Sequence, residues 1–336
     1  MKLLTLVVPC YNSQDYMERC VDSILVGGDR VEIVIIDDGS TDRTPTIADS
    51  YAEKYPNVVK VVHQENGGHG EGINAGLKVA SGKFFKVVDS DDRLSDDFPC
   101  FLDMLETSAS DADLVVNNYV YTYEDGSKDN PIRFSNVFPS RKIVGWNDTR
   151  SFNMRQVLMI HCCAFKTEIA KKYGGDLPKH IFYEDNLYVC KTLPHTDKLF
   201  FTDLDLYRYT IGRPGQSVAV EVMTKRYRHQ ILIADSIFRS CDLGAIKQKS
   251  KRLFKYLYHE MQVMYAGACA YAMHSDDPDY YKNLTDMWAS AFAHDKKFAK
   301  KLRGNFIIRM LNLKGRFGKI VAVFLYDFTR KLFKFN

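Results

Sequence analysis

Three aspartates stand close together directly after an apolar run. Asp89, Asp91 and Asp92 follow the residues Phe84–Val88. Clustered carboxylates repel one another unless a cation compensates their charge. Oxygen donors favour Mg²⁺ or Mn²⁺, which proteins usually hold through one or two carboxylates together with substrate phosphates. The cluster therefore predicts a divalent-metal site, and a solvated acidic turn is the alternative.

Polar segments of a similar kind follow three earlier apolar runs. They are, in chain order, Pro9–Asn12, Asp37–Ser40 and Gln64–Gly68. Each of them could be an ordinary turn, because Asn, Asp and Gly form turns readily. In a parallel sheet, however, the carboxyl ends of the strands meet at one edge, where α/β proteins bind their ligands. Four such segments in succession indicate a binding site.

A second acidic pair lies much later in the chain. Glu184 and Asp185 begin an apolar-periodic stretch that continues to Leu193. Acidic residues in the first turn of a helix interact favourably with its dipole, so the pair has a purely structural explanation. A carboxylate at the base of a cleft can also act as a general base. Together with the acidic cluster at 89–92, the pair is a catalytic candidate.

Two further motifs are ambiguous. Gly70–Ala75 reads G-x-G-x-x-A, a dinucleotide-binding pattern, and Asp89 follows its first glycine by 19 residues. This pattern normally follows the first strand of a sheet, whereas here it follows the third, and one ribose-binding acid does not explain an acidic cluster. Arg213–Ser217 is a basic turn whose arginine could meet a phosphate, although such loops are often merely solvated. An NAD-type oxidoreductase remains an alternative function.

The apolar runs and helical periodicities predict the elements that position these residues. Strands are expected at Leu3–Val8, Val31–Ile36, Val58–His63, Phe84–Val88 and Ala112–Val116. Helices are expected after Ser13, before Pro56, and at Gly70–Ala80, Phe98–Thr107, Ser151–Met159 and Lys166–Tyr173, whereas 117–150 reads as irregular and the chain after 220 as mostly helical. Repeated βα units form a mostly parallel sheet with helices on both faces, so the fold class is α/β.

The charge is distributed unevenly along the chain. The 336 residues are 46% hydrophobic and 26% charged, which excludes global disorder and indicates about two domains. Residues 296–336 contain 12 Lys and Arg against one acid, Asp327, although the whole chain has a net charge of only +4. This basic segment could pack on the body, lie on an anionic membrane surface or mediate homo-oligomerisation. No recognition motif indicates nucleic acid as a partner.

The sequence also indicates a cellular environment. No run reaches the roughly 20 apolar residues of a membrane-spanning helix, and no signal-peptide pattern precedes the first strand. The 8 cysteines show neither a Cys-x-x-Cys motif nor a zinc-ligand spacing. Such scattered thiols are typical of a reducing compartment. We expect a cytoplasmic protein, and the basic segment adds the expectation of peripheral attachment to the inner face of the cytoplasmic membrane.

The strand-end motifs together resemble those of the bacterial family 2 glycosyltransferases. The matching segments are Val8–Asn12, Ile36–Asp42, Asn66–Gly68, Asn74–Gly76 and Val88–Asp92, in the expected order and at the expected intervals. The resemblance is strong over residues 1–110, thinner to about 220, and then ends. It implies a Rossmann-like GT-A fold with a nucleotide-sugar-binding half over 1–110 and an acceptor-binding, catalytic half over 111–220. A helical, basic C-terminal region would follow over 221–336.

The resemblance also implies roles for individual residues on the donor side. The family transfers a sugar with inversion from a nucleotide donor, commonly a UDP-sugar. The residues expected to line the nucleotide pocket are Pro9, Tyr11, Asn12, Asn66 and Gly68, with either Asp37 or Asp38 facing the base. Asp89 is expected to contact the ribose or help orient the site, and Asp91 to bind the Mn²⁺ or Mg²⁺ that bridges the diphosphate. Asp89 is also a candidate metal ligand.

The same resemblance assigns the acceptor side of the reaction. Asp185 is the expected base that deprotonates the acceptor hydroxyl, with Glu184 as its neighbour. The turn from Arg213 to Ser217 is expected to belong to a loop that closes over the diphosphate. A single base opposite the leaving group would give direct displacement and hence inversion, whereas a glycosidase would need two carboxylates and no nucleotide site.

One position departs from the family pattern. Many relatives carry Arg directly before the Asn of the Asn-Ala-Gly group, where this chain has Ile73. The charge of that Arg is therefore either absent or supplied by His69, Lys78 or Arg213.

The function expected from these residues is a metal-dependent glycosyltransferase of the hexosyl or N-acetylhexosaminyl class. Its acceptor is expected to be a hydroxyl of a glycan, a glycolipid or another cell-surface molecule, in polysaccharide or cell-envelope biosynthesis. A catalytically silent nucleotide-sugar-binding protein is an alternative, beside the oxidoreductase that Gly70–Ala75 would serve. The donor sugar, the acceptor and the linkage are not specified by the sequence.

Overall fold

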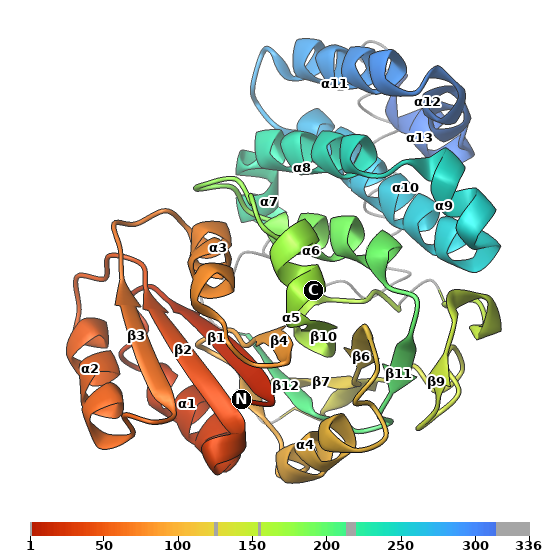
Figure 1. Ribbon diagram of the computed structural model, residues 1–336. Helices are drawn as coiled ribbons and strands as arrows, with labels where there is room; N and C mark the ends of the chain where they lie inside the picture. Colours follow the sequence, from red (N-terminus) through yellow and green to blue (C-terminus); the bar gives the residue numbers. More distant parts are fainter. Residues whose placement is uncertain (1, 124–126, 154–155, 213–219, 314–336) are drawn as a thin grey trace. The chain divides into compact units, whose positions relative to one another are not determined.

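A computed structural model of the protein describes residues 2–123, 127–153, 156–212 and 220–313 (Figure 1). The chain divides into two compact units, Met1–Arg213 and Pro214–Asn336. Each unit buries a hydrophobic core of its own. The first unit contains the strand-end segments that carry the candidate site.

The first unit begins with the alternating strands and helices that the sequence predicts. In chain order they are β1 (Leu4–Cys10), α1 (Met17–Leu25), η1 (Gly28–Arg30), β2 (Val31–Asp37), α2 (Thr44–Lys54), β3 (Val59–His63), α3 (His69–Val79) and β4 (Phe84–Val87). Every residue of β1, β2 and β4 is buried, which explains why these strands are mostly apolar runs in the sequence.

The remainder of the first unit differs more from the prediction. Its elements are β5 (Arg93–Leu94), α4 (Phe98–Glu106), β6 (Leu114–Val116), β7 (Tyr119–Tyr123), β8 (Asn130–Ile132), β9 (Ile143–Val144), η2 (Trp146–Asp148), η3 (Ile160–Cys162), β10 (Cys163–Lys166), α5 (Thr167–Ile169), η4 (Ala170–Gly174), α6 (Glu184–Thr192), η5 (Leu193–His195), β11 (Leu199–Phe201) and β12 (Tyr207–Ile211). The stretch 117–150, expected to be irregular, therefore contributes three strands.

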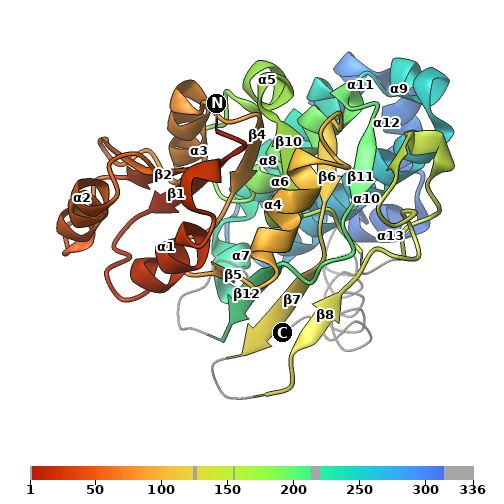
Figure 2. The same ribbon diagram turned by 60° about the horizontal axis from the view of Figure 1, so that its bottom comes forward.

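The strands form two sheets. The larger has the order β3-β2-β1-β4-β10-β6-β11-β9, and the smaller has the order β5-β12-β7-β8 (Figure 2). In the larger sheet β3, β2, β1 and β4 are parallel, and so are β6 and β11, whereas β10 and β9 pair antiparallel with their neighbours. Figure 1 shows α1 on one face of this sheet and α3 on the opposite face. The predicted α/β fold with a mostly parallel sheet is confirmed.

The helix predicted at Ser151–Met159 is wrong. The described residues of this stretch, 151–153 and 156–159, contain no helix. The Gln156 side chain holds the segment in another conformation, because its amide nitrogen donates to the Arg133 carbonyl at 2.5 Å and its oxygen accepts from the Asn153 amide at 2.8 Å. Tertiary hydrogen bonds here outweigh a helical pattern of apolar residues.

The described part of the second unit is helical, as predicted. Its helices are α7 (Val220–Lys225), α8 (Tyr227–Ser240), α9 (Leu243–Lys249), α10 (Lys251–His274), α11 (Tyr280–His294), α12 (Lys296–Arg303) and α13 (Phe306–Leu311). Helix α10 packs against α8, α9, α11 and α13 and is the centre of this unit. Among the residues that the structure describes, no helix has the length and apolar character needed to cross a bilayer.

Candidate active site

The polar segments after β1, β2 and β4 meet at one edge of the larger sheet. Because these strands are parallel neighbours, Cys10 lies opposite Asp37 and Val7 lies opposite Val87. Residues that follow the three strands therefore leave the sheet at the same level. The candidate site predicted from the sequence is brought together at this edge by the strand register itself.

The segment after β1 is linked to the segment after β2. Asn12 adopts a left-handed backbone conformation, with φ of 50°. Its backbone N–H donates to Ser40 Oγ at 3.0 Å, and its side-chain oxygen accepts the Thr41 N–H at 2.9 Å. Tyr11 is 54% exposed beside this link, so its ring is available to a ligand. Pro9 is buried in β1, and its side chain lies below Gly72 of α3.

Asp37 and Asp38 are both buried and both hydrogen bonded. The Asp38 carboxylate accepts the backbone N–H groups of Gly67 and Gly68, each at 2.8 Å. The Asp37 carboxylate accepts the Ser40 N–H at 3.1 Å and lies 2.8 Å from His63 Nδ1. Asp38 thus holds the loop before α3, and Asp37 holds the loop after β2.

The loop before α3 carries the other predicted nucleotide contacts. Asn66 is exposed at this loop. Gly68 has a φ of 84°, a conformation that L-residues rarely adopt, and it directly precedes the first residue of α3. The Gly67 carbonyl accepts the His180 N–H at 2.8 Å, so the loop is also fastened to the segment before α6. The roles of Asn66 and Gly68 toward a nucleotide remain predictions.

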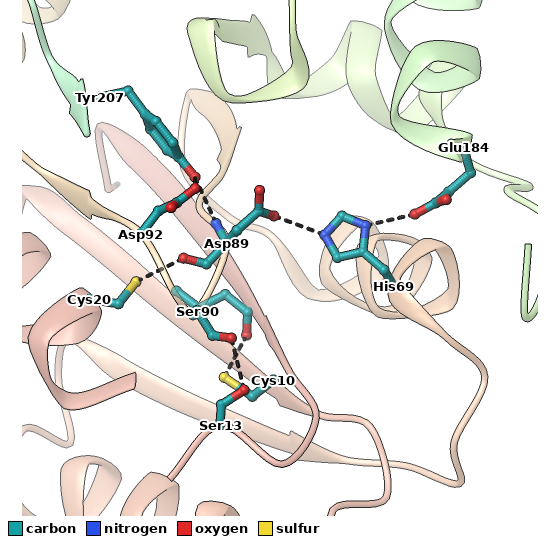
Figure 3. A network of polar contacts seen from close by, with 10 residues as sticks. Cys10, Ser13, Cys20, His69, Asp89, Ser90, Asp92, Glu184 and Tyr207 are labelled. Atoms are coloured by element: carbon teal, nitrogen blue, oxygen red, sulfur yellow. Dashed lines mark hydrogen bonds and ion pairs between the residues drawn. The ribbon is translucent and has the colours of Figure 1, made fainter. Parts of the chain in front are cut away.

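The acidic cluster after β4 separates into two kinds of carboxylate. Asp92 is buried, and its carboxylate accepts the Tyr207 hydroxyl at 2.7 Å (Figure 3). It also accepts the Thr210 N–H at 2.8 Å. Burial, together with the charge of Asp89, raises the pKa of Asp92 to about 8. Asp92 therefore ties β12 to the end of β4, and Asp89 and Asp91 remain the candidate metal ligands of the cluster. Asp89 and Asp91 are half-buried.

These two remaining carboxylates fit a divalent cation. Asp89 and Asp91 offer hard oxygen donors two residues apart at the end of β4. Among the residues described here, no group of three or more His, Cys, Asp and Glu could hold a metal ion by itself. Two carboxylates suit a cation such as Mg²⁺ whose other ligands are substrate phosphates and waters.

His69 joins the donor side of this edge to the first turn of α6. Its Nε2 lies 3.0 Å from Asp89 Oδ1, and its Nδ1 lies 2.7 Å from Glu184 Oε1 (Figure 3). Burial alone would lower the pKa of His69, but its hydrogen bonds to both carboxylates outweigh that effect and raise the pKa well above its ordinary value. Burial would likewise raise the pKa of Asp89, yet the hydrogen bond and charge of His69 lower it.

Glu184 and Asp185 differ sharply although they are adjacent. Tyr183, with φ of 72°, starts α6 so that Glu184 is buried and engaged by His69. Asp185 is half-buried. Burial and the neighbouring charge of Glu184 raise the pKa of Asp185 to about 7. A carboxylate that titrates near neutral pH is suited to proton transfer, which favours Asp185 over Glu184 as a base.

Three residues were expected as possible sources of the charge missing at Ile73, and the structure describes two of them, His69 and Lys78. Ile73 itself is fully buried. Lys78 is 73% exposed and lies 4.0 Å from Glu71, whereas His69 lies between Asp89 and Glu184. Arg213 and Ser217, which were expected in a loop over the diphosphate, lie outside the described residues.

Two tyrosines that the sequence motifs did not indicate border the site. Tyr121 of β7 and Tyr209 of β12 are half-exposed and pack edge to face, with ring centroids 5.5 Å apart. Burial and the charges of Asp89, Asp92 and Asp185 raise the pKa of Tyr209. The period-two spacing of tyrosines, at 119, 121 and 123 and at 207 and 209, was the signal that could have found them.

The glycines of Gly70–Ala75 serve packing. A Cβ at Gly70 would lie 2.8 Å from Glu184 Cγ, and a Cβ at Gly72 would lie 3.1 Å from Pro9 Cβ. These glycines therefore let α3 approach α6 and β1 closely. The strand before them, β3, is the edge strand of the sheet. Neither observation supports the dinucleotide-binding alternative, which expects the motif at the first strand.

Comparison with known proteins agrees with this arrangement. A region of the glycosyltransferase GlyG of Streptococcus pneumoniae is 39% identical over 131 residues, which cover 37% of this chain and 41% of that protein. TarS 1–349 of S. aureus, solved in complex with UDP-GlcNAc, has a TM-score of 0.60 at 21% identity over 93% of this chain and 90% of that one. A mannosyltransferase from Pyrobaculum calidifontis, solved with GDP-Man and Mn²⁺, has a TM-score of 0.53 at 18% identity over 96% and 87%.

The likeness to TarS and the mannosyltransferase supports the expected GT-A fold. The sequence matches span 32–41% of the length of GlyG and two further curated glycosyltransferases. Residues 5–174, which include the strand-end segments and His69, match the family described as glycosyl transferase family 2. This match covers half of the chain, and the sheet edge it contains has the geometry that the motifs predicted. The chain belongs to glycosyl transferase family 2.

Proposed function

We propose that the protein transfers a sugar, with inversion, from a UDP-sugar to a hydroxyl of a glycan, a glycolipid or another cell-surface acceptor. The observation that carries this proposal is the carboxylate of Asp185, half-buried and with its pKa raised to about 7, in the first turn of α6, where Glu184 is joined through His69 to Asp89. A base and a donor-side carboxylate are thus held in one connected set of residues. The GlyG match and the family match support a glycosyltransferase.

Residues of the sheet edge would receive the donor. Tyr11 presents an exposed ring, and Asn12 and Asn66 present exposed amides beside it. A nucleobase stacks on an aromatic ring and accepts hydrogen bonds from amides, so these residues suit a nucleoside diphosphate. The UDP-GlcNAc bound in TarS supports a UDP-linked donor of hexosyl or N-acetylhexosaminyl type.

A Mn²⁺ or Mg²⁺ ion would be held by Asp89 and Asp91. When bound, it would neutralise charge on the departing nucleoside diphosphate. The Mn²⁺ in the Pyrobaculum mannosyltransferase supports this part of the proposal.

Asp185 would act on the other reactant. Its carboxylate takes the proton of the acceptor hydroxyl while the hydroxyl oxygen attacks the anomeric carbon. The bond from that carbon to the diphosphate oxygen breaks, and the nucleoside diphosphate leaves as an anion. One displacement from the face opposite the leaving group inverts the configuration. The buried Glu184 is engaged by His69 and supports this arrangement instead of taking the proton.

The test is a screen of nucleotide-sugars by UDP release in the presence of Mn²⁺, followed by Asp185→Asn. We expect the variant to lose about 10²–10⁴-fold in kcat, which is the usual contribution of a general base, while it still binds UDP in a thermal-shift assay. The exposed Asp96→Asn is the matched control and should retain full activity. Full activity of Asp185→Asn would show that the base is misassigned. UDP binding without transfer by the unaltered chain, for every donor, would support the silent binding protein.

We also propose that the basic segment 296–336 attaches the cytoplasmic enzyme to an anionic membrane surface. In its described part, Lys296, Lys297, Lys300, Lys301 and Arg303 are exposed on α12. Phe306 and Ile307, at the start of α13, are 71% and 45% exposed. Cations beside exposed apolar side chains are what an interfacial helix needs.

Deleting residues 300–336 should lower binding to vesicles that contain phosphatidylglycerol. Equal binding by the shortened and full chains would contradict the attachment. A change of molecular mass in solution on deletion would instead assign the segment to homo-oligomerisation.

A further inference from the structure

His69 lies where three segments of the first unit meet. It is the first residue of α3, yet its ring contacts Asp89, which follows β4, and Glu184, which lies 115 residues later in α6. Both contacts are made to carboxylate oxygens, which accept hydrogen bonds when ionised. His69 therefore links the donor side of the site to its acceptor side through one hydrogen bond from each ring nitrogen (Figure 3).

Two sets of hydrogen bonds hold the helix that carries His69 in place. The side chain of Asn74, one turn further along α3, donates to the Leu177 carbonyl and accepts the Leu177 N–H, each at 3.0 Å. The Gly67 carbonyl accepts the His180 N–H just before α3 begins. These bonds fasten α3 to the segment that leads into α6. The distance between His69 and Glu184 is thus set by the fold, and it does not depend on the ion pair alone.

The close approach is also built into the sequence next to His69. A Cβ at Gly70 would lie 2.8 Å from Glu184 Cγ, so any other residue there would displace the Glu184 side chain. Glu184 is only 4% exposed, which means that its charge has little solvent to screen it. Removal of His69 would leave this buried carboxylate without its hydrogen-bond partner, next to Asp185.

We propose that His69 is a positioning residue, which holds Glu184 and Asp89 in register so that the base Asp185 and the donor face the same point. The inference rests on the proposed function and deepens it. It assigns to Glu184 a structural partner and to His69 a role in the rate of transfer.

The first experiment is His69→Ala, measured with saturating donor and acceptor. We expect kcat to fall by roughly 30-fold, because misplaced groups in an active site lose rate on this scale, with a smaller change in the KM of the acceptor. Val79→Ala, on the same helix and 40% exposed, is the matched control and should leave kcat unchanged. The ring of His69 is 37% exposed, so added imidazole can enter the vacated space and should restore part of the rate. A purely structural role would not allow this rescue.

The second experiment is a double-mutant cycle with Glu184→Gln. If His69 acts through Glu184, the kcat of the double variant should lie no more than about 3-fold below that of the less active single variant, because the second change removes nothing further. Multiplicative losses would overturn the proposal, as would wild-type kcat for His69→Ala. If the alanine variant does not fold, His69→Asn, which keeps one donor, takes its place in the cycle. The double variant Glu184→Gln/His69→Asn should then retain more activity than the product of the two single losses predicts. If Asp185→Asn loses transfer activity but His69→Ala does not, this inference is wrong and the proposed function still stands.

Discussion

The two units of the chain treat their polar residues in opposite ways. In Met1–Arg213, where acids outnumber bases by 32 to 24, buried carboxylates such as Asp38 and Asp92 accept several hydrogen bonds from distant segments. In Pro214–Asn336, where bases outnumber acids by 22 to 10, Glu260 is buried in α10 with Oε1 unpaired among the residues described. The first unit uses buried carboxyl groups to fix loops, whereas the second gains stability from apolar helix packing and carries most of its charged side chains at the surface.

The first test, which has the largest expected effect, removes a carboxylate that holds a loop. Asp38→Ala leaves the N–H groups of Gly67 and Gly68 without their acceptor. Each unsatisfied buried donor costs about 1–3 kcal/mol, so we expect the free energy of unfolding to fall by about 3 kcal/mol. Chemical denaturation measures this change, and donor binding should weaken with it. Asp96→Ala, at an exposed site of the same unit, is the control, and equal stability of the two variants would contradict the role of Asp38.

The second test addresses the surface of the helical unit. Phe306→Ser combined with Ile307→Ser removes the exposed apolar pair but leaves every charge. Partition onto vesicles with phosphatidylglycerol should weaken by about 2 kcal/mol, or about 30-fold, because apolar contact with the acyl region is lost. Sedimentation with vesicles measures it. Transfer to a water-soluble acceptor should not change, and a loss of activity there would argue against a separate attachment surface.

The third test concerns Asp185, the carboxylate of the first unit that we assign as the base. The pKa of Asp185 is raised to about 7, and a base acts in its deprotonated form. The kcat should therefore rise about tenfold between pH 6 and pH 8 and level off above that range. Asp185→Asn should have a flat profile at its residual rate. A wild-type profile that is flat over this range would be inconsistent with Asp185 as the base.

The smallest effect is expected from the unpaired acid of the second unit. Burial raises the pKa of Glu260 to about 8, whereas Glu in an unfolded chain titrates near about 4.3. The folded form thus holds a proton that the unfolded form releases, and stability falls as the pH rises through this window. Glu260→Gln should therefore stabilise the protein more at pH 8 than at pH 5. Asp286→Asn, exposed on α11, should show no such difference in thermal unfolding.

Much of the first half of the chain could be predicted because its signals are local. The buried strands β1 and β2 are continuous apolar runs, and the parallel order that follows from βα repeats brings Cys10 and Asp37 to one edge. The contacts that define the site are not local. His69 and Glu184 are 115 residues apart, and no periodicity in either segment indicates that they meet. Asp92 looks like a metal ligand by spacing, and only its burial against Tyr207 identifies it as structural.

The glycines of α3 have a consequence for how the site forms. Gly70, Gly72 and Gly76 lie within one helix of 11 residues, and each lowers its intrinsic stability by about 1 kcal/mol relative to alanine. A helix of this composition has little tendency to form in isolation. It is ordered because it docks, through Asn74 and the Gly67 carbonyl, on the segment before α6. Folding of α3 and assembly of the site are thus one cooperative event, and amide hydrogen exchange along 71–79 reports when the two halves of the active site have come together.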